Sequence, residues 1–166
     1  MYNDLYYSIN KAKEKKDAVK IDLAKFVSER VSFFASLANS KNITTDFIAD
    51  EDSFVLMREV DLLRVVDNTL SNAVKYGKTG TIILIRVVKR ADSVEFSCQN
   101  NGPDLKNPNR VFEDGYREGF EQIGMGIGLE IVASICHSYA IDASVISQNS
   151  ITKFTYVLPR FFKGVL

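Results

Sequence analysis

The sequence contains few of the residues that metal centres and disulfide frameworks need. Its 166 residues include one histidine and two cysteines. Cys98 and Cys136 lie in apolar stretches without the spacing of metal ligands, which predicts buried, reduced thiols and fits a reducing cytoplasm. Because His137 is the sole histidine, a His-rich metal site is excluded, and a serine-histidine-aspartate triad would depend on this one residue.

Long hydrophobic runs and an excess of one charge are also missing. The longest apolar run, residues 82–88, is interrupted by Arg86 and is much shorter than the roughly 18 residues of a membrane span. The N-terminus shows no basic region followed by an apolar segment, so we expect no signal peptide. Basic and acidic side chains number 21 each, which leaves no net positive charge to attract nucleic acid or an anionic membrane.

What is present is the composition of one globular domain, with 46% hydrophobic and 25% charged residues. Helical periodicity or capping signals mark four segments, the second starting at the N-cap Asp22 and the third capped by Asp61 and stopped by Gly77. These segments are residues 2–16, 22–39, 61–76 and 126–139.

Strand patterns predict three hairpins: residues 43–48 with 54–58, residues 81–89 with 93–99, and residues 143–147 with 152–158. The last hairpin turns at Asn149 and Ser150. We therefore expect an α/β (α+β) two-layer sandwich, in which one mixed sheet of about five to six strands is covered on one face by three helices.

The helix at residues 61–76 has two distinct faces. At 100° per residue, its apolar residues gather on one side, while Asn68, Asn72 and Lys75 gather roughly opposite, with Tyr76 at the edge. Asparagine is a mediocre helix former, so two asparagines at positions i and i+4 of one helix need an explanation. Amide oxygens suit Mg²⁺, and lysine offers a counter-charge for phosphate. The alternative is a solvated face, and this helix alone does not distinguish it from a metal and phosphate site.

Two further segments are candidates for a phosphate site. Alternating glycines at the start of a helix, in residues 124–129 (GMGIGL), allow close approach of phosphate to backbone amides, although a flexible hinge is the alternative. Residues 100–103 (NNGP) end a strand and are followed by about twenty residues without periodicity. Aromatic residues in this stretch favour a lid over a solvated tether; they are Phe112, Tyr116 and Phe120.

The order of these features resembles the catalytic ATP-binding domain of sensor histidine kinases, in the superfamily shared with gyrase, MutL and heat-shock chaperone ATPases. The resemblance covers roughly residues 21–159. Residues 61–76 look like the asparagine box of the family, residues 111–117 like its phenylalanine box, and residues 124–129 like its second glycine box. The resemblance implies a fold of the Bergerat type with an ATP lid, and it implies ATP and Mg²⁺ as cofactors.

The resemblance also implies roles for individual residues. Asn72 would coordinate Mg²⁺ bridging the phosphates, and Asn68 would assist from one turn earlier. Lys75 would contact phosphate, and Tyr76 would flank the adenine. Asn68 and Lys75 are thus the implied catalytic residues. The remaining residues implied in nucleotide binding belong to the two glycine boxes; they are Asn100, Gly102, Gly124, Gly126, Gly128 and Leu129.

Four positions depart from the family pattern or divide its branches. Asn100 replaces the aspartate that accepts the adenine amino hydrogen, and Asp104 replaces the second glycine of the first box. In the phenylalanine box, Gly115 replaces an aromatic residue. The ATP-hydrolysing branch has a glutamate as general base where this chain has Asn68, which cannot take a proton at neutral pH. A kinase is therefore favoured over an ATPase.

The resemblance implies a division of the chain and a set of partners. Residues 1–20 would be the C-terminal end of a dimerisation helix, and residues 21–166 the catalytic domain. The phospho-acceptor histidine would lie on a domain outside this chain, with His137 a structural or surface residue. We expect the chain to be the cytoplasmic part of a membrane-bound sensor, which is a homodimer and acts on a response regulator. The alternatives are a non-catalytic nucleotide-binding regulatory module and a serine kinase of the anti-sigma-factor type.

Overall fold

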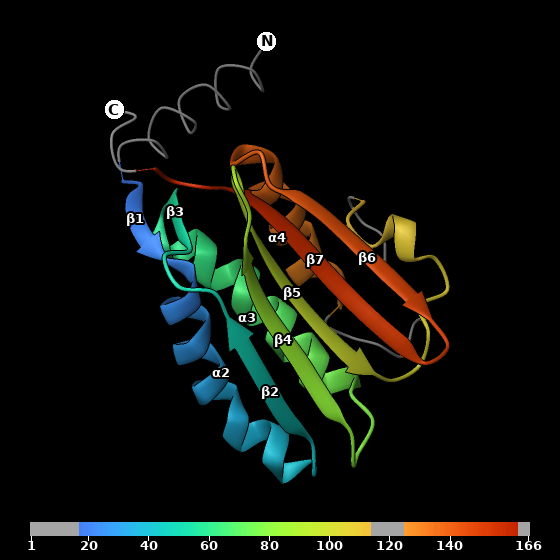
Figure 1. Cartoon of the computed structure of the whole chain (residues 1–166). Coiled ribbons are helices and arrows are strands. Elements are labelled where there is room, and N and C mark those ends of the chain that lie inside the picture. Colours follow the sequence, from blue (N-terminus) through green and yellow to red (C-terminus); the bar gives the residue numbers. More distant parts are fainter. Residues whose placement is uncertain (1–16, 114–124, 163–166) are drawn as a thin grey trace.

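In the computed structural model, three helices cover one face of a five-stranded sheet (Figure 1). The structure describes residues 17–113 and 125–162, and for residues 125–127 it describes the backbone alone. The strands run in the order β2-β4-β5-β7-β6. Their bounds are β2 (Thr44–Ala49), β4 (Ile82–Lys89), β5 (Ser93–Asn101), β7 (Ile151–Pro159) and β6 (Asp142–Gln148). The pair β2 and β4 is parallel and the other pairs are antiparallel, so the sheet is mixed as expected.

A second, smaller sheet stands beside the first. It joins β1 (Val19–Asp22) to β3 (Phe54–Met57) in antiparallel register. The predicted hairpin of residues 43–48 with 54–58 is therefore wrong, because its two strands belong to different sheets. β1 is a strand that the sequence did not predict.

The helices are α2 (Leu23–Ser40), α3 (Glu59–Tyr76) and α4 (Met125–Ser138), and a short 3₁₀ turn, η1, spans Pro108–Arg110. α2 begins as predicted, with the Asp22 carboxylate accepting from the Lys25 amide at 3.2 Å. α2 and α3 are joined by a two-bond ion pair between Arg30 and Asp67, at 2.7 and 2.8 Å. α3 ends at Tyr76, just before Gly77, as expected.

The start of α3 differs from the prediction. Arg58, not Asp61, stands at the N-cap, and no side chain caps the helix there. Asp61 is buried, with 2% of its surface exposed, and accepts two hydrogen bonds from Arg58 and one from the Tyr139 hydroxyl. A buried carboxylate requires such partners, so this aspartate ties the start of α3 to the end of α4 instead of capping a helix.

The core lies between the helices and the inward face of the sheet. Alternate residues of each central strand are buried, such as Ile83 and Ile85 on β4 and Phe96 and Cys98 on β5. Cys98 and Cys136 are both free and buried, which confirms the prediction. Burial raises the pKa of each thiol to about 12, so both remain protonated at neutral pH.

Candidate functional site

The polar residues of α3 differ in burial, and one of them, Asn68, contacts α4. Thr69, 2% exposed, lies near the middle of the buried face, and Asn72 lies only about 60° from it around the helix axis. Both Asn68 and Asn72 are half-buried, and Lys75 is exposed. The expected position opposite the apolar side therefore fits the exposed Lys75, whereas Asn68 and Asn72 lie on the flank of the helix, where Asn68 contacts α4.

Asn68 contacts the first turns of α4. Its amide nitrogen donates to the Arg64 carbonyl at 2.6 Å, and its amide oxygen occupies the space that a Cβ on Gly128 would need. A glycine at position 128 thus lets the two helices approach each other at this point. Gly126 also lies within the first turns of α4, whereas Gly124 lies outside the described residues.

The end of α3 carries the other candidates. The Asn72 side chain makes no hydrogen bond with any other residue in the described part of the chain. The Lys75 ammonium lies 5.1 Å from the centre of the Tyr76 ring. The Tyr76 hydroxyl is buried and has no hydrogen-bond partner among the described residues. A half-buried amide and an unpaired hydroxyl near one end of a helix leave polar groups available to a ligand.

The end of β5 lies against the end of α3. The buried Gly102 donates its amide to the Ser150 carbonyl at 3.0 Å, and a Cβ on it would overlap the Tyr76 carbonyl oxygen. Asn100, 6% exposed, lies two residues earlier and faces the helices. The structure therefore brings Asn100, Gly102 and Tyr76 together, as the resemblance implied. Leu129 is 3% exposed in the core, so its side chain is packed and only its backbone could serve a ligand.

The segment after β5 is fastened to the turn between β6 and β7. The Asp104 carboxylate accepts from the Ser150 amide at 2.8 Å, and the Leu105 amide donates to the Ser147 hydroxyl at 2.8 Å. Asn149 and Ser150 both have positive φ, at 55° and 60°, in the predicted turn. Asp104, which replaces a glycine of the family pattern, thus gains a structural role that its sequence position did not reveal.

The expected lid is described only at its start. Phe112 packs edge-on against Phe154 and Tyr156, with ring centres 6.0 and 6.4 Å apart, so this ring is anchored to the core. The further lid residues Gly115, Tyr116 and Phe120 lie outside the described residues.

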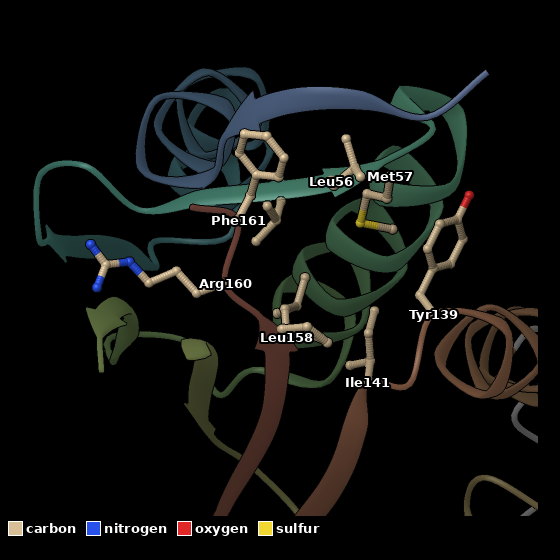
Figure 2. A pocket seen from close by; sticks show the side chains of 9 residues that line it. Leu56, Met57, Tyr139, Ile141, Leu158, Arg160 and Phe161 are labelled. Atoms are coloured by element: carbon tan, nitrogen blue, oxygen red, sulfur yellow. The ribbon is translucent and has the colours of Figure 1, made fainter. Parts of the chain in front are cut away.

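A cavity of about 270 Å³ lies away from these candidates, between β3 and the end of β7 (Figure 2). Its lining is mainly apolar and includes Met57, Ile141, Leu158 and Phe161. It adjoins the last residues of β7, whereas Asn101 pairs with the first residue of that strand. The cavity therefore lies toward the opposite end of the sheet from the Asn100 and Gly102 cluster.

Sequence reasoning missed two polar contacts that hold α3. The first is the Asp61 cluster, where burial raises the pKa of Tyr139 and the Asp61 carboxylate raises that of Arg58, so the tyrosine remains protonated and the arginine charged. The second joins Thr69 to Tyr156, whose oxygens are 2.8 Å apart. A threonine among the leucines and valines of a buried helical face was a signal for such a contact.

In the described ranges, 17–113 and 125–162, no helix is long and apolar enough to cross a membrane. The same residues contain no cluster of three or more histidine, cysteine, aspartate or glutamate side chains that could hold a metal.

Residues 57–161 match the HATPase_c family, described as histidine kinase-, DNA gyrase B- and HSP90-like ATPase. This match spans more than half of the chain, which therefore belongs to that family. The fold is that of the ATP-binding catalytic domain found in sensor histidine kinases.

Named relatives agree with this assignment. The sensor histidine kinase CusS of Escherichia coli O6:H1 is 31% identical over 145 residues, which is 84% of this chain and 30% of that protein. The sensor protein CopS of Pseudomonas syringae pv. tomato is 30% identical over 152 residues, 87% of this chain and 28% of that protein. The chain thus spans about a third of the length of these relatives.

Solved structures share the fold. The catalytic domain of the histidine kinase ThkA superposes with a TM-score of 0.77 at 20% identity, over 86% of this chain and 95% of that one. Full-length ShkA in complex with AMPPNP superposes with a TM-score of 0.73 at 22% identity, over 88% of this chain and 32% of that one.

Proposed function

We propose that this chain binds MgATP and delivers the γ-phosphoryl group to a histidine that lies outside it. The products would be ADP and a phosphohistidine on a dimerisation domain, from which a response regulator would take the phosphoryl group. The observation that carries the proposal is the flank of α3, where Asn68 contacts Gly128 of α4 and the amide of Asn72, one turn later, has no hydrogen-bond partner among the described residues.

The donor set fits magnesium. Mg²⁺ prefers oxygen ligands and keeps several waters and phosphate oxygens, so one or two amide oxygens suffice on the protein side. Asn72, assisted by Asn68, would hold the ion, and Lys75 would contact a phosphate. Tyr76, Asn100 and Gly102 would face the base, and the amides at Gly124, Gly126 and Gly128 would face the phosphates. Bound magnesium would neutralise charge that develops on the transferring phosphoryl group.

Two observations favour phosphoryl transfer over hydrolysis. Asn68 is an amide, which at neutral pH cannot act as the general base that activates water. The sole histidine, His137, is exposed in the last turn of α4, whereas Asn68 contacts α4 near its start. The phospho-acceptor would therefore be a histidine of another domain.

The remaining assignments rest on the resemblance to sensor histidine kinases, whose members named above are longer than this chain. Residues 1–20 would belong to a dimerisation helix and residues 21–166 to the catalytic domain, although that boundary falls inside β1. The longer protein would be a homodimeric sensor whose catalytic part lies in the cytoplasm.

Nucleotide titration with and without Mg²⁺ tests the proposal. Asn72→Ala should abolish most of the magnesium-dependent gain in ATP affinity, because a methyl group cannot replace an amide oxygen. Asn39→Ala, at an exposed asparagine in the last turn of α2, is the matched control and should bind as the wild type does. Unchanged affinity in a folded Asn72→Ala variant would contradict the metal role. Failure of the wild type to bind ATP productively would favour a non-catalytic regulatory module with an altered glycine box.

A further inference from the structure

A fully buried tyrosine in the sheet makes a directional contact with α3. The Tyr156 hydroxyl lies 2.8 Å from the Thr69 hydroxyl, which lies 2.7 Å from the Val65 carbonyl oxygen. Because a carbonyl can only accept, Thr69 donates to Val65 and accepts from Tyr156. The hydrogen bonds thus run in one direction, from β7 into the middle of α3.

The Tyr156 ring is itself held from two sides. It is stacked on Phe96 with ring centres 5.7 Å apart, and Phe112 meets it edge-on. Burial raises the pKa of Tyr156, so its hydroxyl keeps its proton and remains a donor at neutral pH. A donor whose ring is fixed in this way defines one direction for Thr69.

Thr69 lies on α3 between the two asparagines of the candidate metal site. Asn68 precedes it and Asn72 follows it by one turn. The apolar contacts of α3 are non-directional, and they tolerate a small turn of the helix about its axis. A side-chain amide lies about 6 Å from that axis, so a turn of about 10° moves it by about 1 Å. Functional groups need placement to within about 0.5 Å, so such a turn matters.

We propose that Tyr156 is a positioning residue that, through Thr69, fixes the rotation of α3 and so holds Asn68 and Asn72 in the geometry that magnesium requires. The inference rests on the proposed function, in which these asparagines serve the metal. Tyr156 itself does not touch the nucleotide.

The experiment compares ATP affinity in Mg²⁺ with ATP affinity in EDTA, using the full chain. We expect Tyr156→Phe to reduce the ratio of the two affinities about five- to tenfold, with the affinity in EDTA nearly unchanged. Thr69→Val should do the same, and the double variant should show no further loss, because both changes remove one hydrogen bond. Thr69→Ser keeps the hydroxyl and should keep the ratio.

Tyr139→Phe is the matched control. It also removes a tyrosine hydroxyl bonded to α3, but at Asp61, about two turns before Asn68. It should lower the melting temperature and leave the affinity ratio at the wild-type value. If Tyr139→Phe lowers the ratio as much as Tyr156→Phe, general loosening explains both and the positioning role is overturned.

Asn72→Ala, measured in parallel, separates the two proposals. If it loses the magnesium dependence while Tyr156→Phe and Thr69→Val keep it, the positioning role is wrong and the metal site stands. If Asn72→Ala keeps the dependence, the metal site itself is wrong and the inference fails with it. Should Tyr156→Phe not fold, the contrast between Thr69→Val and Thr69→Ser decides the question alone.

Discussion

Replacing Gly128 by alanine should separate stability from nucleotide binding. The added Cβ would overlap the amide oxygen of Asn68, which is the far end of a flexible side chain and can move away. Alanine in place of glycine within a helix contributes about 1 kcal/mol of stability. Loss of the bond from Asn68 to the Arg64 carbonyl costs about 0.5–1.5 kcal/mol. The two terms nearly cancel, so the free energy of unfolding should change by less than about 1 kcal/mol.

The affinity of Gly128→Ala for MgATP, in contrast to its stability, should fall. The displaced Asn68 amide leaves the face that it shares with Asn72, and loss of one such polar contact, about 1.4 kcal/mol, is a tenfold loss of affinity. Urea denaturation followed by fluorescence and titration with a fluorescent ATP analogue in Mg²⁺ give the two quantities on the same protein.

Gly102→Ala is the contrasting variant. Its Cβ would overlap the carbonyl oxygen of Tyr76, which is backbone and cannot rotate away. We expect this variant to lose about 1–3 kcal/mol of stability. The reasoning is refuted if Gly128→Ala binds MgATP as tightly as the wild type, or if it is destabilised as much as Gly102→Ala.

Three further outcomes are expected. Asn100→Asp should bind ATP about fivefold more tightly than the wild type and discriminate more sharply against GTP, since a carboxylate is a stronger acceptor and cannot donate; competition of ATP and GTP for one fluorescent nucleotide measures both. Incubated alone with labelled ATP, the chain should stay unlabelled, and label that disappears in His137→Ala would overturn the exclusion of this histidine. Because the pKa of both Cys98 and Cys136 is raised from 9.0 to about 12, the folded chain holds these protons longer than the unfolded chain. The free energy of unfolding should therefore fall as the pH rises from about 9 to about 12, and a flat denaturation profile would contradict this burial.

Local signals predicted α2, α3 and α4 and the two hairpins formed by consecutive strands, whereas the helix expected at residues 2–16 lies outside the described residues. The pair β4 and β5 and the pair β6 and β7 were expected within one or two residues, because their strands alternate and short turns join them. The pairing of β2 with β4 was missed, since parallel neighbours are set by packing across the intervening α3. β1 has only four residues, and its pairing with β3 defines it.

The sequence indicated which residues are candidates for the site, but it indicated their arrangement only in part. The spacing of Asn68 and Asn72 placed both on one face, but only tertiary contacts could show that this face meets Gly128. Asp61 has a position that suits a cap, and its burial depends on Tyr139, which lies 78 residues later. Likewise, the contact of Asp104 with Ser150 joins segments 46 residues apart.

The parallel pairing of β2 with β4 bears on how the chain is made. As the protein leaves the ribosome, β2 emerges before β3, the whole of α3 and β4, so it has no strand to pair with during that interval. The two hairpins, by contrast, can close in microseconds once their second strand is synthesised. A nascent chain that pauses after Gly77 would therefore present residues 44–49 as an unpaired strand edge, the kind of surface on which chains associate. We therefore expect slow translation of α3 and β4 to lengthen the time during which this edge is exposed.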